Sequence, residues 1–187
     1  MSKRFVPDNE SGLVAFGEEL LDEVTEGARE SARKRSIVRF HEHGDVVQRM
    51  LNALEPETYV RPHRHQVTGK REAFVALRGA LLVVRFEENG RPVEGVVVSA
   101  EGPVRGVEVP KGEWHSIISL ESGTVMYEVM LGPYDTATHK EFAPWAPPEE
   151  DGEASAAYMQ SLRAGFEVAL PELEARDRIE AEEDEIC

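Results

Sequence analysis

The residues with the clearest chemical potential are histidines near the middle of the chain. His63 and His65 are two residues apart in a run that reads as a β-strand. Side chains at alternate strand positions point to the same face, so both imidazoles can reach one metal ion. Two neutral imidazoles bind weakly alone, and a metal site needs further ligands. Two residues of ligand type stand at the start of later predicted strands: Glu72 directly before residues 73–77, and His115 at the head of residues 115–120.

The same alternation predicts the neighbours of the histidine pair. Tyr59 and Arg61 share its strand face, and the other predicted inward positions are mostly apolar. We therefore expect an apolar cavity with a few polar groups, as in most ligand sites. A buried arginine needs an anionic partner. Two partners stay open for Arg61: a bound carboxylate or phosphate, or a protein carboxylate such as Glu108 or Glu128.

A loop rich in proline and aromatic residues is predicted over residues 132–148. Tyr134 and Lys140 in this loop could belong to a lid over the metal. Together with Arg61 and Tyr59 they are the tentative substrate-binding residues. Trp145 is explained as a hydrophobic plug for the loop.

Other polar and aromatic residues indicate less. His41 and His43 stand beside Gly and Asp, which predicts a solvated loop; the alternative is a place at the cavity mouth. Trp114 precedes His115 and should point the opposite way, into the core or a dimer interface. His139 carries no distinguishable signal. Cys187 is the single cysteine, so an intrachain disulfide is excluded. It is also a poor candidate for a nucleophile, because chain ends are rarely held rigidly.

Short runs rich in β-branched residues, separated by turn signals, must position the candidate ligands. Eight such runs at near-regular spacing predict a sandwich or barrel. Asn89-Gly90 between two of them predicts a hairpin. The runs cover residues 46–54, 58–65, 73–77, 80–86, 93–99, 104–109, 115–120 and 124–130. Helices with an apolar stripe are expected from Glu18 to about Lys34 and from about Ala154 to Val168.

Length and composition predict one domain. The 187 residues are enough for a single core. Within this domain, residues 1–45 form an N-terminal helical segment and lead-in strand, 46–131 the barrel, and 132–187 the lid-like loop, the C-terminal helix and an acidic tail. A net charge of −15 repels the phosphates of nucleic acids and anionic lipids, so neither is an expected partner. No signal peptide or membrane-spanning run is evident, and we expect a cytoplasmic protein.

The order of the candidate residues resembles the two signature motifs of the cupin superfamily. The matching residues are His63, His65, Glu72, Gly79, Pro110, Gly112 and His115. The resemblance implies a mainly β fold: a single double-stranded β-helix, or jelly-roll barrel, with flanking N- and C-terminal helices. It also implies that the three histidines and Glu72 hold one divalent transition metal ion. Iron, manganese, zinc and nickel all suit such a ligand set.

Two departures from the cupin motifs concern the surroundings of the ligands. The gap between His65 and Glu72 is longer than usual, which predicts a longer turn within residues 66–71. Ser119 stands where the second motif normally has an asparagine. The spacing from Glu72 to Gly79 is preserved, so Glu72 keeps its place on its own strand.

Longer sequence segments narrow the resemblance to the WbuC family of cupin-fold metalloproteins. They lie at residues 47–56, 58–65, 132–135 and 140–147, and the similarity covers roughly 28–148. Members of that family are associated with surface-polysaccharide and O-antigen gene clusters. Cupins often pair, and a strand that is apolar on both faces must bury both. We therefore expect a homodimer that uses outward residues such as Val75 and Leu77.

Three functions are compatible with these features. The first is a metal-dependent enzyme, of an isomerase or epimerase kind, that acts on a small sugar-derived or acidic metabolite. The second is a non-haem iron dioxygenase, which the same ligands could support. The third is a binding or sensing module for a small molecule. Catalytic residues cannot be assigned beyond the ligands, because function depends on the site more than on the fold.

Overall fold

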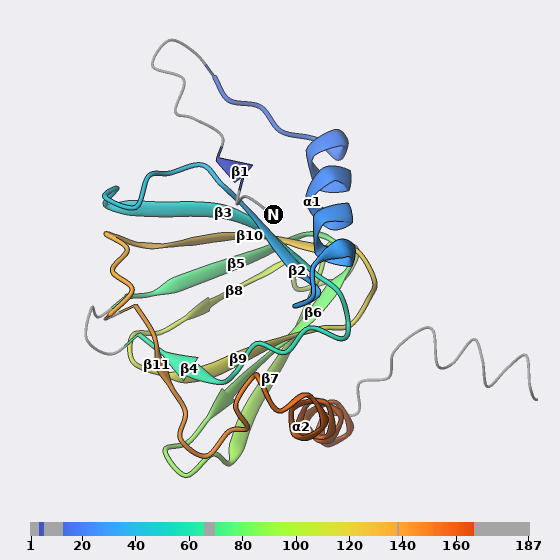
Figure 1. The fold of residues 1–187 in the computed structure, drawn as a ribbon, viewed down its shortest axis with the longest axis vertical. Coiled ribbons are helices and arrows are strands. Elements are labelled where there is room, and N and C mark those ends of the chain that lie inside the picture. The colour runs from blue at the N-terminus through green and yellow to red at the C-terminus, as the bar shows by residue number, and fades with distance from the viewer. Residues whose placement is uncertain (1–3, 6–12, 66–69, 138, 167–187) are drawn as a thin grey trace, which may run out of the picture.

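The computed structural model describes residues 4–5, 13–65, 70–137 and 139–166 (Figure 1). Within these residues the chain is mainly β, with a helix on the outer side of each sheet, as the cupin resemblance implies. The elements are β1 (Arg4–Phe5), α1 (Glu18–Glu30), β2 (Arg35–Arg39), β3 (Val47–Leu54), β4 (His63–Arg64), β5 (Glu72–Arg78), β6 (Ala80–Phe86), β7 (Pro92–Ser99), β8 (Gly106–Val109), β9 (Trp114–Ser119), β10 (Thr124–Leu131), β11 (Glu141–Phe142) and α2 (Gly152–Gly165).

Two sheets face each other and form the barrel. The first has the strand order β1-β2-β3-β10-β5-β8, and the second the order β11-β4-β9-β6-β7. The strands pair antiparallel except β1 and β2, which are parallel. In Figure 1 the first sheet lies above the second. The mainly β jelly roll predicted from the sequence is confirmed.

Strand β6 is apolar at nearly every position because both of its faces are buried. Leu81 and Val83 point into the space between the sheets, where they pack with Phe74 and Ile117. Leu82, Val84 and Phe86 point outward into a second cluster. A strand that is buried on both faces needs a continuous apolar run, which the sequence of β6 provides.

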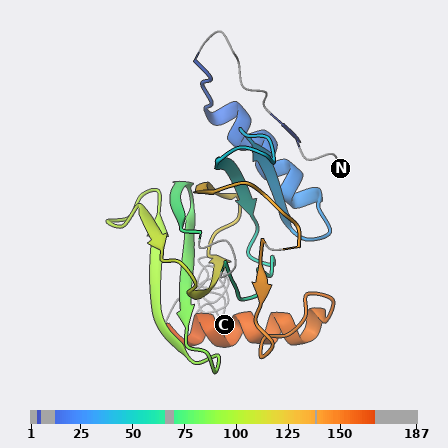
Figure 2. The ribbon, with the colours of Figure 1, turned by 90° about the vertical axis from the view of Figure 1, so that its left-hand side faces the viewer.

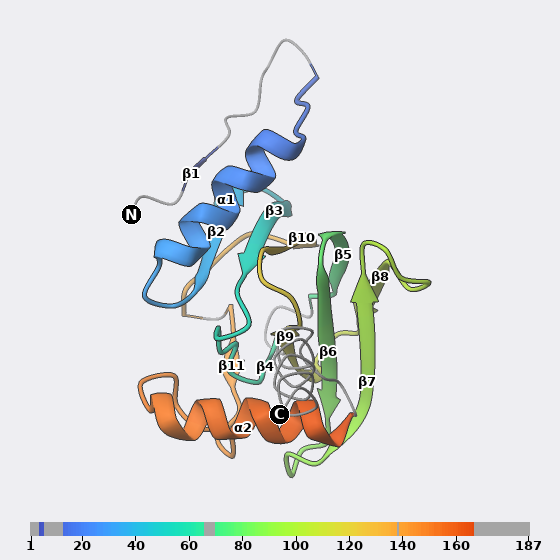
Figure 3. The same cartoon turned by 90° about the vertical axis from the view of Figure 1, so that its right-hand side faces the viewer.

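The two helices cover the outer faces of the sheets. Leu21, Val24 and Ala28 of α1 pack against β2, β3 and β10. On the opposite side, Leu162 of α2 packs on the cluster beneath β6 and β9. Figures 2 and 3 show the two helices on opposite sides of the sheets. None of the helices in the described ranges is long and apolar enough to cross a membrane.

Several expected boundaries change. The strand predicted at residues 58–65 is reduced to His63–Arg64, because Thr58 turns back to bond the Glu55 carbonyl and Pro62 has no N–H to donate. The first helix ends at Glu30 because the next residue, Ser31, adopts an extended conformation with a ψ of 137°. Residues 66–69, Val168 and the acidic tail lie outside the described residues.

The predicted hairpin and the outward apolar residues can also be compared with the structure. Asn89-Gly90 does join the paired strands β6 and β7, and Gly90 has a φ of 87°. Val75 is 42% exposed, whereas Leu77 packs against the cluster under α1. The homodimer stays a prediction.

Candidate metal centre

The four predicted ligands come together between the two sheets. His63 on β4 is the direct cross-strand partner of His115 on β9, and His65 directly follows β4. Glu72 begins β5 on the opposite sheet. One donor atom from each residue lies within 4.8 Å of the others, and all four side chains are buried. Residues from two sheets therefore surround one point.

Hydrogen bonds to the backbone orient all three imidazoles in the same way. The Nδ1 of His63 bonds the Arg61 carbonyl at 2.9 Å, and the Nδ1 of His115 bonds the Glu113 carbonyl at 3.0 Å. The Nδ1 of His65 contacts the His139 carbonyl. A carbonyl only accepts, so each Nδ1 donates to its carbonyl and the Nε2 edge of each ring faces the centre of the cluster. This is the arrangement by which proteins prepare histidine for a metal.

Glu72 lies between two of these Nε2 atoms. Its Oε1 is 2.7 Å from the Nε2 of His65, and its Oε2 is 2.8 Å from the Nε2 of His115. Burial by itself raises the pKa of the Glu72 carboxyl, but the contacts with His115 and His65 outweigh it and hold the pKa well below its usual range. Burial lowers the pKa of His63 well below its usual value. The carboxylate and the neutral imidazole are the forms that bind metal.

The donor set fits a divalent transition metal. The Nε2 of His63 is buried and has no hydrogen-bond partner among the described residues. A buried polar atom without a partner costs about 1–3 kcal/mol, which a coordinate bond would offset. Three imidazoles and one carboxylate suit iron, manganese, zinc or nickel, so the ligands do not select among them.

A cavity of about 360 Å³ opens beside the ligands. Its walls include His63 and Glu72, so a molecule in the cavity would lie against the cluster. The volume is at the small end of the range for ligand pockets, which favours a small metabolite. Apolar side chains such as Phe74 and Ile117 form part of the wall, as expected. The wall also carries more positively charged side chains than expected. They are Arg33, Arg35, Arg39, Arg61 and Lys140.

The tentative substrate-binding residues occupy different places. Arg61, Tyr134 and Lys140 line the cavity, but Tyr59 does not, and its hydroxyl donates to the Pro147 carbonyl at 2.9 Å. Arg61 forms no ion pair with either carboxylate considered from the sequence within the described residues. Glu108 pairs with Arg71, and Glu128 accepts a hydrogen bond from Asn52.

Two residues that the sequence did not assign to the site, His139 and Arg39, belong to it, and so does Glu128, which the sequence suggested only as a partner for Arg61. His139 supplies the carbonyl that orients His65, and its ring lies 5.0 Å from that ring, centroid to centroid. Arg39 and Glu128 line the cavity. Side-chain alternation along β2 and β10 predicts that Arg39 and Glu128 point inward. The contact of His139 is made by its backbone carbonyl, and no sequence pattern predicts such a contact.

The prediction of a solvated loop is wrong for His41 and holds for His43. His41 is buried, and its Nδ1 bonds the backbone of Arg49. His43 is exposed, but its ring lies 4.8 Å from that of Tyr134, and both histidines line the cavity. The pair therefore stands at the cavity mouth. Trp114 lies in the core, as expected, and donates to Glu88.

Glu128 is expected to make stability fall as the pH rises. The area it exposes faces the cavity, and burial, followed by the nearby Glu72, raises its pKa to about 8. The folded state therefore keeps a proton that the unfolded chain loses above a pH of about 4.5. Stabilisation is complete below that pH and is lost as the pH rises through 8.

Glu128→Gln removes this titration and keeps a polar side chain. In metal-free protein, urea unfolding should show the variant roughly 1–3 kcal/mol more stable than the parent at a pH near 8.5, with a much smaller difference near pH 5. An equal difference at both pH values would contradict the assignment.

The chain was compared with protein-family models, with curated proteins and with solved structures. Residues 16–98 match the family model described as Domain of unknown function (DUF6016). No curated protein matches the chain. Among solved structures, the capsular polysaccharide assembling protein CapF from Staphylococcus aureus is similar with a TM-score of 0.48 and 23% identity, over 60% of this chain and 32% of CapF. The chain thus spans about a third of the CapF length.

Two further structures show a comparable level of similarity. KdgF from Halomonas sp. has a TM-score of 0.43 and 16% identity, over 55% of this chain and 82% of that one. The cupin domain of Schizosaccharomyces pombe Cnp3 has a TM-score of 0.41 and 14% identity, over 56% of this chain and 67% of that one.

Proposed function

We propose that this protein is a metal-dependent enzyme that acts on a small sugar-derived or acidic metabolite. One observation carries the proposal: three imidazoles with the same proton arrangement and one buried carboxylate surround a point on the wall of a small cavity. Fully enclosed metal sites are structural, whereas catalytic ones keep access for a substrate. The open cavity beside His63 and Glu72 provides that access.

The chain's own residues would bind and orient the substrate. When bound, the metal would supply Lewis acidity at a substrate oxygen. Lys140 adds a positive charge near His63 and Glu128, as its effect on the pKa of both residues indicates. The protonated Glu128 carboxyl faces the cavity and can hold or donate a proton there. An isomerase or epimerase kind of reaction needs these elements: an oriented oxygen, a nearby cation and a group that moves a proton.

The biological setting belongs to the same proposal. The sequence segments shared with the WbuC family suggest a place in surface-polysaccharide or O-antigen biosynthesis. A cavity of about 360 Å³ suits a small precursor better than a polymer.

Elemental analysis of protein purified without an affinity tag tests the proposal, together with mass spectrometry of any released molecule. We expect about one divalent transition metal ion per chain and no dioxygen uptake after anaerobic loading with iron. Dioxygen consumption would replace the proposal with a non-haem iron dioxygenase. Tight co-purification of an unreacted ligand would favour a binding or sensing module.

A further inference from the structure

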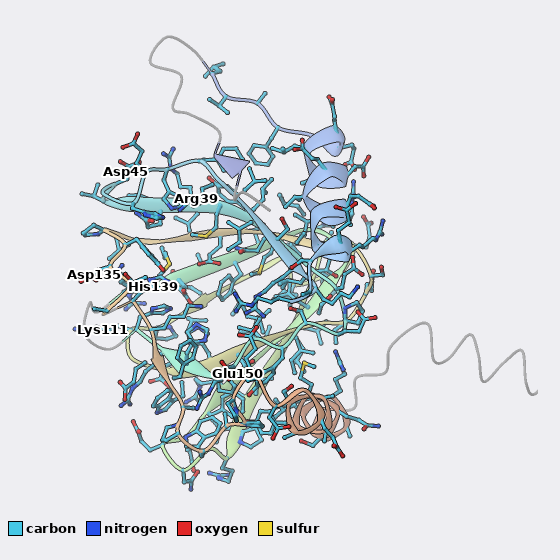
Figure 4. All side chains as sticks on the ribbon, in the orientation of Figure 1. Arg39, Asp45, Lys111, Asp135, His139 and Glu150 are labelled. Atoms are coloured by element: carbon cyan, nitrogen blue, oxygen red, sulfur yellow. The ribbon has the colours of Figure 1, made fainter. Side chains whose placement is uncertain are left out.

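Two arginines line the cavity from opposite walls. Arg39 ends β2 of the first sheet, and Arg61 lies two residues before His63 in β4 of the second sheet. Figure 4 shows Arg39 on the same side of the molecule as His139, with the loop that carries Asp45 nearby. Both guanidinium groups therefore approach the space beside the ligand cluster.

Neither arginine has a carboxylate partner in the part of the chain that the structure describes. A nitrogen of Arg39 contacts the Nε2 of His43. Arg61 donates to the Ala143 carbonyl at 2.8 Å and stands 5.5 Å from the ring centroid of Phe142. The Nε of each arginine is buried and without a partner among these residues. Buried N–H groups left in this way are costly, and a ligand oxygen would satisfy them.

The other two arginines on the cavity wall provide an internal comparison. Arg33 and Arg35 both hold the Glu149 carboxylate, with nitrogen–oxygen distances of 2.6 to 3.0 Å. Arg35 also donates to the Tyr59 carbonyl at 2.6 Å. Among the described residues, the protein thus supplies its own carboxylate to one pair of arginines and none to Arg39 and Arg61.

The charges around the cavity favour an anion in spite of the net charge of −15. Of the carboxyl groups that line it, Glu149 is neutralised by two arginines, and Glu128 keeps its proton at neutral pH because its pKa is raised to about 8. Glu72 belongs to the ligand cluster. Lys140 adds a further positive charge. Short-range attraction inside the cavity can therefore select an anion that the protein surface repels at long range.

The distance between the arginines and the ligand cluster limits the size of the anion. The strands of Arg39 (β2) and Glu72 (β5) are separated by three inter-strand spacings in the first sheet, which corresponds to about 14 Å between their backbones. Both side chains line the cavity and so shorten the gap between their charged ends. A molecule of a few carbon atoms can span the remaining distance between the charged ends of these two side chains, which agrees with the cavity volume of about 360 Å³.

We infer that the cavity binds a small sugar acid or sugar phosphate, with its carboxylate or phosphate between Arg39 and Arg61 and a hydroxyl or carbonyl oxygen facing the ligand cluster. The planar guanidinium group offers two parallel N–H donors to two anionic oxygens, which lysine cannot do. This assignment rests on the proposed function for the metal end. The anion end can be tested with or without metal.

Isothermal titration calorimetry with gluconate, glucose 6-phosphate and neutral glucose tests the inference on metal-loaded and metal-free full-length protein. At least one of the two anions should bind, and glucose should not; the tighter of the two anions identifies carboxylate or phosphate. Arg39→Gln should weaken anion binding at least 10-fold, and Arg39→Lys should recover only part of the loss. Arg91→Gln is the matched control, since Arg91 pairs with Glu87 on the surface away from the cavity.

Binding of neither anion to the parent protein would overturn the inference, as would equal affinities for Arg39→Gln and Arg91→Gln. Arg61→Gln should act like Arg39→Gln, but it also removes a bond to the loop at Ala143. Thermal unfolding will show whether it folds; if it does not, Arg39→Gln decides alone. Metal-loaded protein that binds neither anion refutes only the anion site. Protein that binds an anion but no metal refutes only the metal centre.

Discussion

Glu72→Gln is expected to lower the affinity for the metal more than about 100-fold, because replacing even an outer partner of a ligand commonly costs about 10- to 100-fold. The amide keeps the size of the side chain but loses the charge that faces His65 and His115. In the parent protein a chelator should lower the melting temperature, since a ligand that binds only the folded state stabilises it. In the variant the chelator should have little effect.

Glu108→Gln is the matched control for this experiment. Glu108 lies on β8, on the sheet that carries Glu72, but it is exposed and pairs with Arg71 at the surface. Exposed ion pairs of this kind contribute about 1 kcal/mol or less. Metal content should therefore equal that of the parent protein. If Glu72→Gln also keeps a full complement of tightly bound metal, Glu72 is not a ligand.

Gly79→Ala is expected to destabilise the fold by roughly 2–4 kcal/mol. Gly79 joins β5 to β6 with a φ of 66°, a conformation that residues with a Cβ adopt at a cost. A Cβ at this position would lie 2.6 Å from the Oγ1 of Thr124 and 3.2 Å from its Cα. Thr124 is buried and donates to the Ala80 carbonyl, so it cannot move aside without losing that bond.

Gly44→Ala provides the comparison for the Gly79 substitution. A Cβ at Gly44 would meet nothing within 4 Å, and its φ is not in the left-handed region. We expect an effect within about 0.5 kcal/mol of zero by urea unfolding. Equal losses in the two variants would mean that neither the backbone of Gly79 nor its contact with Thr124 matters for stability.

Local periodicity, together with the resemblance to the cupin motifs, explains why much of the fold and the ligand set could be predicted. Alternation along a strand decides which side chains share a face, and this placed His63 on the cavity wall. Glycine at position 79 marked the turn after β5, where only a residue without a Cβ fits easily. Where the alternation was extended through 58–65, the prediction failed for Tyr59, because the chain there is not a strand.

Contacts between distant segments decided the rest. The Nδ1 of His65 finds the carbonyl of His139, more than seventy residues away, and no local pattern predicts that meeting. Glu149 joins Arg33 and Arg35 only because the loop after β11 returns across the cavity. The sequence by itself determined which residues could bind a metal, through residue type, strand period and the resemblance to the cupin motifs. Only the tertiary structure decided which carboxyl group keeps its proton and which arginines find no carboxylate among the described residues, because burial and charge pairing depend on strand pairing and loop packing.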